Sequence, residues 1–302
     1  MIGVSEATRR AQAALQLRMR QLGVQLDADL VEPCLGELAA LIVRRVDVVG
    51  GCPIVGLSGA QGTGKSTLAW LLSDLLWHGF GKRSTVVSLD DYYLARAERA
   101  ALTKHAHPLL VTRGVPGTHA VATLQAALRS LRLLAAGECC ALLRFDKATD
   151  ERMSETRDCV GPLDLILLEG WCVGARPQSS AELAEPVNTL ESLEDLDGTF
   201  RGFVNTQLAG PYAALWHELE LLVYLAAPDM QSVLAFRAQQ EDMLRRAAGT
   251  SATGLMDESK LRRFIQHFER LTLHMLRTGP DYADAIVQVD ANRRWTLNVR
   301  SV

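Results

Sequence analysis

Apolar and polar positions follow a helical period at the start of the chain and a mixture of two periods afterwards. Residues 6–22 and 29–46 repeat apolar side chains at helical spacing, and Pro33 falls in the first turn of the second segment, where a proline is tolerated. After a break at the VVGGC phrase (48–52), short apolar runs alternate with segments of helical spacing. This alternation predicts an α/β fold whose central, mostly parallel sheet is covered by helices on both faces.

These runs define the expected elements. Strands are predicted at 53–58, 84–89, 140–145, 163–168, 219–226 and 285–289, and helices at 65–78 and 120–136. Residues 181–197 carry six acids and no base, which fits either a disordered insert or a packed surface excursion. Residues 246–258 are small, polar and Gly-bearing, which predicts a mobile loop between two helices.

Composition narrows the class of protein. With 302 residues, 48% of them hydrophobic, the chain can bury a large core, and a formal charge of -3 argues against nucleic acid as the main partner. No run of 18 apolar residues is present and the start lacks the apolar core of a secretory signal, so neither a membrane span nor export is expected. Six cysteines without a C-x-x-C pair predict reduced thiols in a cytoplasmic protein. The Arg-rich residues 1–23 suit either an amphipathic helix or an organelle transit peptide.

The most specific motif lies between a predicted strand and a predicted helix. Residues 59–66 read GAQGTGKS and fit the pattern G-x-x-x-x-G-K-[ST], which binds nucleoside triphosphates in that setting. Backbone N–H groups of the turn and the helix N-terminus would face the phosphates, with Lys65 at the β- and γ-phosphates and the Ser66 hydroxyl on Mg²⁺. The predicted nucleotide-binding residues are Gly59, Gln61, Gly62, Thr63, Gly64, Lys65, Ser66 and Thr67.

Polar residues also gather where other predicted strands end. SLDDYY (88–93) places carboxylates where a base could take a proton from a substrate hydroxyl, although a helix cap or a turn explains them equally well. LILLEG (165–170) carries Glu169 near its end, the expected form of a Walker B acid that orders Mg²⁺. These two segments predict a reaction centre beside the Gly-rich turn.

Two further segments suit an anionic substrate. Asp146 and Lys147 follow an apolar run, with Arg152 close behind, and would form either a substrate wall or a surface ion pair. The RGVPGTH turn (113–119) brings Arg113 and His119 to the sheet edge. Arg113 is the stronger candidate of the two, because a lone histidine in a turn is more often solvated than functional.

Together these segments resemble the P-loop D-glycerate 3-kinases of plant and fungal type and their bacterial relatives, a family grouped with uridine kinase, phosphoribulokinase and pantothenate kinase. The resemblance covers most of residues 50–290 and is carried by GAQGTGKST, SLDDYYL, RGVPGTH, RFDKATDER, LLEGW, PVNTLE, VNTQLAGPY, FRAQQE and MDESKLRRFIQHFERLT. It implies a P-loop NTPase fold with a lid, and it makes the acidic segment a family element. The implied division is an N-terminal helical extension at 1–48 and a kinase domain at 49–302, with the acidic excursion near 176–199 and the lid near 228–256.

The resemblance also assigns roles. It implies that Asp90 is the general base, that Ser66 and Glu169 hold Mg²⁺, and that Lys65 and a lid arginine stabilise the transferred phosphoryl group. Arg237 is the best match for that arginine, with Arg245 and Arg246 as alternatives. The expected substrate contacts are Asp91, Tyr93, Arg113, His119, Asp146, Lys147 and Arg152.

The predicted function is that of an ATP- and Mg²⁺-dependent kinase that phosphorylates a hydroxyl of a small anionic substrate, with D-glycerate to 3-phosphoglycerate first. One departure weakens that choice of acceptor: the family's PGTH turn is usually followed by aspartate, and this chain has Ala120. A nucleoside, pantothenate or another sugar acid is an alternative acceptor, and a nucleotide-dependent switch protein is an alternative class. No nucleic-acid or membrane partner is expected, and the sequence leaves the oligomeric state open.

Overall fold

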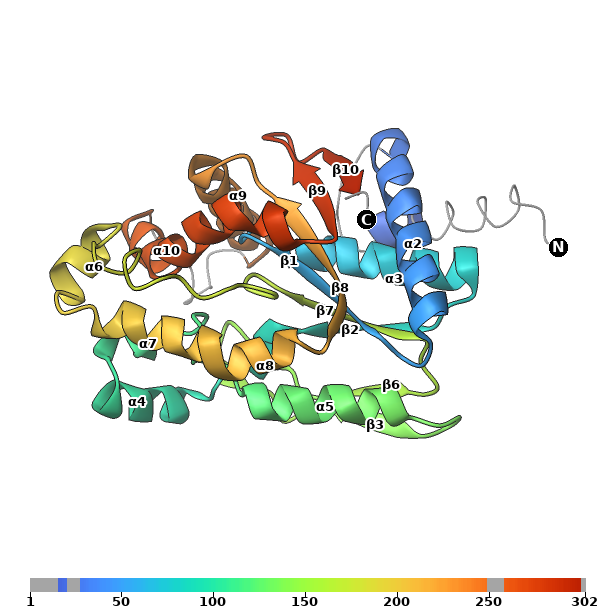
Figure 1. Cartoon of the computed structure of the whole chain (residues 1–302), viewed down its shortest axis with the longest axis horizontal. Coiled ribbons are helices and arrows are strands. Elements are labelled where there is room, and N and C mark those ends of the chain that lie inside the picture. The colour runs from blue at the N-terminus through green and yellow to red at the C-terminus, as the bar shows by residue number, and fades with distance from the viewer. Residues whose placement is uncertain (1–15, 21–27, 249–257, 300–302) are drawn as a thin grey trace.

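The structure, a computed structural model, describes residues 16–20, 28–248 and 258–299 (Figure 1). Its centre is a six-stranded sheet in the order β10-β9-β8-β1-β7-β2, in which β10 alone is antiparallel to its neighbour. The mostly parallel α/β sheet predicted from the sequence is therefore confirmed. Its strands are β1 (Ile54–Gly59), β2 (Ser84–Ser88), β7 (Leu165–Gly170), β8 (Leu219–Ala226), β9 (Ala285–Val289) and β10 (Trp295–Val299).

The central strands are buried on both faces because their side chains alternate between two cores. In β7, Ile166 and Leu168 belong to one core cluster, whereas Leu165 and Leu167 belong to the other. Helices contribute to both clusters, so both faces of the sheet are covered as expected. The first cluster includes residues of α5 (Val121–Leu133), α7 (Thr199–Gln207), α8 (Ala213–Trp216) and α10 (Glu258–Tyr282), and the second includes residues of α2 (Ala28–Val49), α3 (Lys65–Phe80) and α9 (Met230–Ala248).

Helix α2 lies within the segment expected to be an N-terminal extension. Its residues Leu35, Leu38 and Ile42 are fully buried in the same core cluster as α3 and the sheet. Residues 16–20 are helical, and Arg18 pairs with Asp74 of α3 at 2.6 Å. The described part of this segment therefore packs on the sheet, while the rest of the helix predicted at 6–22 lies outside the described residues.

The apolar run predicted as a strand at 140–145 does not join the main sheet. Strand β3 (Cys139–Leu142) pairs with β6 (Arg157–Val160), and β4 (Phe145–Asp146) pairs with β5 (Glu151–Arg152), in two separate antiparallel sheets. A central parallel strand is buried on both faces, whereas two of the four β3 residues are exposed. The prediction that Asp146 and Lys147 follow a strand of the main sheet is therefore wrong.

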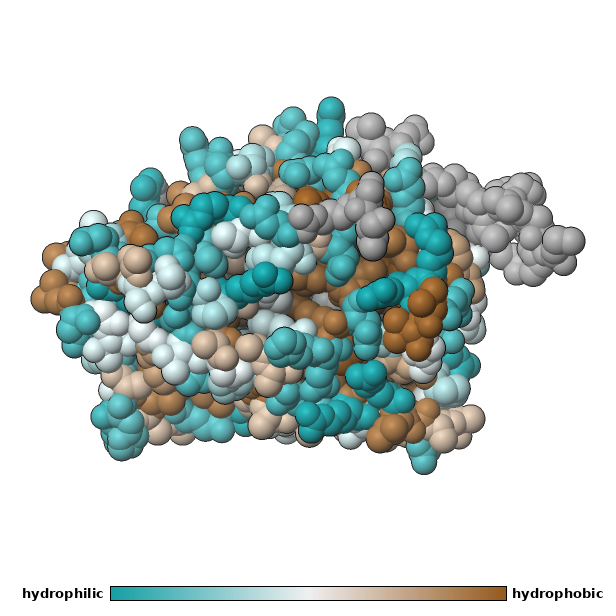
Figure 2. Space-filling model, in the orientation of Figure 1, coloured by the Kyte–Doolittle hydropathy of each residue, from teal (hydrophilic) through white to brown (hydrophobic). Residues whose placement is uncertain are grey.

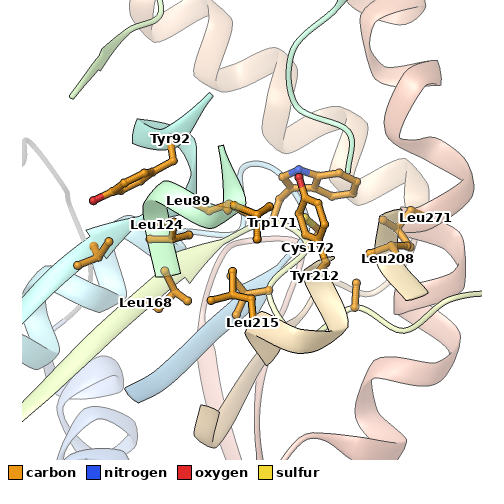
Figure 3. Close-up of a cluster of buried hydrophobic side chains, with 14 of the residues drawn as sticks. Leu89, Tyr92, Leu124, Leu168, Trp171, Cys172, Leu208, Tyr212, Leu215 and Leu271 are labelled. Atoms are coloured by element: carbon orange, nitrogen blue, oxygen red, sulfur yellow. The ribbon is translucent and has the colours of Figure 1, made fainter. Parts of the chain in front are cut away.

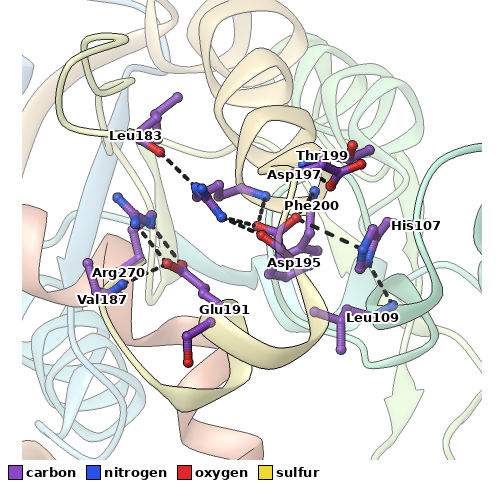
Figure 4. Close-up of polar contacts among 12 residues, drawn as sticks. His107, Leu109, Leu183, Val187, Glu191, Asp195, Asp197, Thr199, Phe200 and Arg270 are labelled. Atoms are coloured by element: carbon purple, nitrogen blue, oxygen red, sulfur yellow. Dashed lines mark hydrogen bonds and ion pairs between the residues drawn. The ribbon is translucent and has the colours of Figure 1, made fainter. Parts of the chain in front are cut away.

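The acidic segment is ordered by buried ion pairs (Figure 4). It contains α6 (Thr189–Glu194). Glu191 and Asp195 are 2% and 1% exposed, and they pair with Arg270 at 2.7 Å and with Arg201 at 2.9 Å. Both arginines also donate to backbone carbonyl oxygens of the same segment. Arginines outside the acid-rich run thus neutralise part of its charge, and the packed alternative is confirmed over the disordered one.

The remaining connections are short elements that the sequence pattern did not predict. They are α4 (Arg96–His105), η1 (Leu89–Tyr92), η2 (Pro108–Val111) and the π-helical turn η3 (Leu208–Tyr212). Most of the loop predicted at 246–258 lies outside the described residues, between α9 and α10. Figure 2 shows polar side chains over most of one face, with apolar side chains in small groups. Among the helices that the structure describes, none is long and apolar enough to cross a membrane.

Candidate active site

The Gly-rich turn leaves β1 and enters α3 at the carboxyl edge of the sheet. Gly59 and Gly62 have positive φ, and Gly64 is the left-handed N-cap of α3. A Cβ on Gly59 would lie 2.6 Å from the Leu225 carbonyl oxygen, and one on Gly62 would lie 2.7 Å from Phe236 Cβ, so both positions require glycine. As at any helix start, the first N–H groups of α3 have no intrahelical acceptor, so the turn and helix together suit an anion.

The other predicted residues of the turn differ in burial. The Thr63 hydroxyl is buried and donates to the Ala60 carbonyl oxygen at 2.8 Å, which holds the turn in shape. Lys65 is also buried, and its ammonium donates to the same oxygen at 3.0 Å. Burial lowers the pKa of Lys65, and the charges of Glu169 and Asp90 oppose that shift. The side chains that are exposed or half-buried are those of Gln61, Ser66 and Thr67.

Glu169 is held by two hydroxyl groups. Its Oε1 atom accepts from Ser66 Oγ at 3.0 Å and from Ser88 Oγ at 2.7 Å. The second bond follows from the fold, because the parallel register of β2 and β7 places Ser88 opposite Glu169. Burial and the nearby Asp90 raise the pKa of Glu169, and Lys65 opposes them. A carboxylate 3.0 Å from a hydroxyl oxygen is the kind of hard oxygen pair that Mg²⁺ prefers.

Asp90 lies in η1, directly beyond β2. Its Oδ2 atom accepts from Lys147 Nζ at 2.6 Å, and its Oδ1 atom accepts from the Tyr93 hydroxyl at 2.8 Å. Burial by itself raises the pKa of this carboxyl group, but the charge and hydrogen bond of Lys147, together with Tyr93, outweigh it. The pKa of Asp90 therefore lies below its usual range, and the group is an anion at neutral pH.

Asp91 makes a different kind of contact. Its Oδ1 atom accepts from the backbone N–H of Phe145 at 3.1 Å, so it ties η1 to β4. Burial raises the pKa of Asp91. The two neighbouring aspartates are therefore distinct: Asp90 pairs with a cationic side chain, and Asp91 anchors the backbone of the β4–β5 hairpin.

Arginines from other parts of the chain fix the turn of that hairpin. Asp150, which has a positive φ of 58°, accepts from Arg99 Nη2 and from Arg113 Nη1 at 2.5 Å each. Arg99 is 1% exposed, and Arg113 also donates to the Lys147 carbonyl oxygen at 3.1 Å. The guanidinium of Arg113, predicted to contact substrate, is thus engaged with the hairpin.

Asp146 and Arg152 support the same hairpin. Asp146 accepts from the Ala148 N–H at 2.8 Å and so closes the turn. Arg152 donates to the Tyr93 carbonyl oxygen at 3.1 Å and lies 2.9 Å from Glu98 of α4. The structure therefore brings the predicted substrate residues of this region together, and most of their charged groups have partners within the protein.

The RGVPGTH turn rests on a buried aromatic cluster (Figure 3). Trp171 Nε1 donates to the Gly114 carbonyl oxygen at 2.8 Å, and the Gly117 N–H donates to the Tyr212 hydroxyl at 3.0 Å. Both aromatic side chains are buried. These two bonds fix the turn at both of its glycines.

His119, at the end of this turn, is buried. Its Nδ1 atom lies 2.6 Å from the Tyr212 hydroxyl, and its ring stacks on Tyr93 with the centroids 4.8 Å apart. Burial lowers the pKa of His119 to about 4. The general expectation that a histidine in a turn is solvated is wrong here, because Tyr93 and Tyr212 enclose the imidazole.

Ala120 takes the N-cap position of α5 and makes no side-chain cap. Aspartate is among the preferred N-cap residues because its carboxylate accepts from the first-turn N–H groups. An aspartate at this position could cap α5, whereas Ala120 cannot.

The predicted lid begins with α9, which packs on the Gly-rich turn. A Cβ on Gly62 would lie 3.2 Å from the Arg237 backbone nitrogen. The Arg237 guanidinium lies over the Phe264 ring at 5.9 Å. The side chains of Arg245 and Arg246 lie outside the described residues.

A small cavity of about 20 Å³ lies among α6, α7 and α10, and Val115 and Pro116 of the RGVPGTH turn also line it. Its walls include Trp171, Phe200 and Arg270. The volume accommodates about one water molecule, and Arg270 is already bonded to Glu191. This cavity does not compete with the P-loop edge as the candidate site.

Sequence reasoning missed Ser88, Tyr212 and Arg99 as residues of the site. Ser88 could be found from the parallel register, since it lies near the end of one predicted strand and Glu169 directly follows another. Tyr212 ends the VNTQLAGPY segment, but no local pattern indicates its bond to His119, because the two residues are far apart in sequence. Arg99 carries no local signal, because its partner Asp150 lies in a hairpin that the pattern did not predict.

Known proteins similar to this chain include kinases of fungi and plants. An uncharacterized kinase, mug58, from Schizosaccharomyces pombe is 32% identical over 226 residues, covering 71% of this chain and 78% of the relative. The chloroplastic D-glycerate 3-kinase of Arabidopsis thaliana is 27% identical over 243 residues, covering 76% of this chain and 50% of the relative. The solved D-glycerate 3-kinase of Cryptococcus neoformans superposes with a TM-score of 0.74 at 24% identity, covering 88% of this chain and 99% of that one. No protein-family model matches the chain.

Proposed function

Because the chain belongs to the P-loop kinase family that includes D-glycerate 3-kinases, we propose that it transfers the γ-phosphoryl group of ATP to a hydroxyl of a small anionic acceptor. D-Glycerate, which would become 3-phosphoglycerate, is the first candidate. The main support is geometric: Ser66 of the Gly-rich turn bonds to Glu169 at 3.0 Å, Glu169 bonds to Ser88 at 2.7 Å, and the anionic Asp90 follows two residues after Ser88. A phosphate cradle positions the transferred group and a carboxylate base can accept the hydroxyl proton, so the two together suit transfer to a hydroxyl.

The proposed step conserves atoms and charge. The acceptor oxygen forms a bond to the γ-phosphorus while the bond between that phosphorus and the ADP oxygen breaks. The acceptor's hydroxyl proton passes to the Asp90 carboxylate. Lys65 and Arg237 would stabilise the charge on the phosphoryl oxygens, which is the main form of catalysis in phosphoryl transfer.

Ser66 and Glu169 are the residues that would hold Mg²⁺. Their hydroxyl and carboxylate oxygens lie 3.0 Å apart at the start of α3, and Mg²⁺ in such enzymes is commonly bound by one or two protein oxygens together with substrate phosphates. When bound, the ion neutralises charge on the β- and γ-phosphate oxygens. Ser88 would orient the Glu169 carboxylate through its 2.7 Å hydrogen bond.

One observation supports an anionic acceptor such as D-glycerate. Lys147, with its ammonium on Asp90, supplies a positive charge beside the proposed base. Asp91, Tyr93, Arg113, Asp146 and Arg152 would then shape the acceptor site by holding η1 and the hairpin in place.

A coupled assay of ADP release tests the function. The wild-type protein with ATP and Mg²⁺ is given D-glycerate, other hydroxy acids, nucleosides or pantothenate, and the Lys65→Ala variant serves as the control. We expect ADP to appear when D-glycerate is added, with 3-phosphoglycerate as the second product, and the variant to lose most of this turnover. Release that responds to a nucleoside or pantothenate instead would reassign the acceptor. Release that responds to no small molecule would contradict the kinase and favour a switch protein.

A further inference from the structure

Three cations predicted to contact substrate lie near Asp90, and they differ in how they are held. Arg113 bonds to Asp150 at 2.5 Å and to the Lys147 carbonyl oxygen, and its side chain is 20% exposed. Arg152 bonds to the Tyr93 carbonyl oxygen and lies 2.9 Å from Glu98. Lys147 pairs with Asp90 at 2.6 Å, yet its side chain is 59% exposed. Lys147 is thus the cation of these three that is best placed to change partners.

The backbone that carries Lys147 is fixed. Its carbonyl oxygen accepts from Arg113 at 3.1 Å, and the Phe145 N–H is held by Asp91 at 3.1 Å. Asp150, at the far side of the turn, is bonded to the buried Arg99. A flexible four-carbon side chain therefore extends from a rigid turn, so the ammonium can move without moving the hairpin.

The ion pair with Lys147 determines how strong a base Asp90 is. In this structure the ammonium occupies Oδ2 and the Tyr93 hydroxyl occupies Oδ1. A carboxylate with a cation at 2.6 Å has a stabilised anion, so it accepts a proton less readily. Removing the ammonium from Oδ2 would make Asp90 a stronger base and open a lone pair toward an acceptor hydroxyl.

On the premise of the proposed function, we propose that the acceptor's own carboxylate draws Lys147 away from Asp90, so that binding of the correct acceptor frees the base that acts on it. In this exchange the ammonium leaves the Asp90 carboxylate and pairs with the acceptor's carboxylate. The net charge of the site changes only by the charge of the bound acceptor. The acceptor's hydroxyl proton then passes to Asp90 as its oxygen bonds to the γ-phosphorus and ADP leaves. A neutral acceptor cannot compete for the ammonium and leaves Asp90 paired.

The test compares D-glycerate with glycerol, which has the same three-carbon chain and no carboxylate. The Lys147→Met variant keeps most of the side-chain length and removes the charge. We expect its kcat/KM for D-glycerate to fall by roughly 10- to 100-fold, the range of a charge-assisted hydrogen bond, mainly through KM. Its kcat/KM for glycerol is expected to rise several-fold above that of the wild type, because Asp90 is no longer paired.

Controls separate the alternatives. Lys147→Arg keeps the charge and should retain the preference for D-glycerate. Lys104→Met removes an exposed lysine of α4 and should change kcat/KM for neither acceptor. An equal loss on both acceptors in Lys147→Met would mean that Lys147 only supports the fold of the site. A loss on D-glycerate with no gain on glycerol would mean that Lys147 binds the carboxylate without controlling Asp90. Either result overturns the exchange while leaving the kinase intact, whereas a wild-type protein that does not use D-glycerate would contradict the proposed function itself.

Discussion

Ser88 and Glu169 are register partners on the adjacent parallel strands β2 and β7, and the serine hydroxyl donates a 2.7 Å hydrogen bond to Glu169 Oε1. The same oxygen accepts from Ser66 at 3.0 Å. Two hydroxyls from different elements thus fix the direction of one carboxylate beside the Gly-rich turn.

Ser88→Ala should weaken the use of Mg²⁺. Losing the bond leaves Glu169 freer to rotate. Because the net free energy of a hydrogen bond is about 1 kcal/mol, we expect a roughly fivefold higher Mg²⁺ concentration at half-maximal rate. The measurement is the rate of ADP release against Mg²⁺ at saturating ATP. Ser84→Ala is the matched control, because Ser84 lies at the other end of β2 and bonds to Ser73. Equal Mg²⁺ dependence in both variants would show that Ser88 does not orient the metal site.

Ala120→Asp should stabilise the protein. Ala120 is the N-cap of α5 and lacks a side-chain cap, and a capping carboxylate adds about 0.5–2 kcal/mol to the free energy of unfolding. Urea unfolding at neutral pH measures the gain. Kinetics for D-glycerate should remain close to those of the wild type. A changed acceptor preference without added stability would place Ala120 in the acceptor site and not at a helix cap.

Glu191→Gln should strongly destabilise the acidic segment. The glutamine keeps the size of the side chain but leaves the buried Arg270 guanidinium without its counter-ion, a change that typically costs about 3–5 kcal/mol. Glu194→Gln is the control, because Glu194 and its partner Arg263 lie on the same two helices but at the surface. Losing this exposed ion pair should cost less than about 1 kcal/mol. Similar midpoints of thermal unfolding for the two variants would contradict a structural role for the buried pair.

Stability should fall in mild acid because of His119. Burial lowers its pKa from 6.5 to about 4 in the folded state, so between these values the unfolded chain binds a proton that the folded one does not. Each pH unit in that window costs about 1.4 kcal/mol, and the loss levels off below the folded pKa. His119→Gln removes this contribution, so the difference in unfolding free energy between wild type and variant should shift by about 2 kcal/mol from pH 7.5 to pH 5.

The control for this experiment is His217→Gln, which removes an exposed imidazole instead of a buried one. Urea unfolding of the three proteins at both pH values gives the comparison. A constant difference between wild type and His119→Gln at the two pH values would mean that His119 is not buried in its neutral form.

The sequence predicted the sheet well because its central strands are apolar on both faces. The sequences of β1, β7, β8 and β9 are more apolar than the residues on either side of them. Strand β9 (Ala285–Val289) has the same bounds as the predicted strand. The half-exposed hairpins between residues 139 and 160 have no such signal, so the pattern assigned one strand where the chain forms four short ones.

For the site, motifs located the residues but not their partners. Asp90 and Glu169 were placed at one edge because each directly follows a predicted parallel strand, and Lys65 because the Gly-rich turn joins it to the end of another. The contacts that define their chemistry are long-range: Lys147 reaches Asp90 from the hairpin, and Ser88 reaches Glu169 across the sheet. Such pairs depend on register and on turns far apart in sequence, which no local pattern contains.

Asp90 is the proposed acceptor of the substrate's hydroxyl proton, and steady-state kinetics of Asp90→Asn and Asp91→Asn side by side decide whether it has this role. With ATP, Mg²⁺ and D-glycerate, Asp90→Asn should lose roughly 10²–10⁴ in kcat, the usual contribution of a general base, while nucleotide binding survives. Asp91→Asn should lose much less, because the asparagine oxygen can still accept from the Phe145 N–H. An active Asp90→Asn beside an inactive Asp91→Asn would exchange the two roles, and full activity in both would contradict base catalysis by either residue.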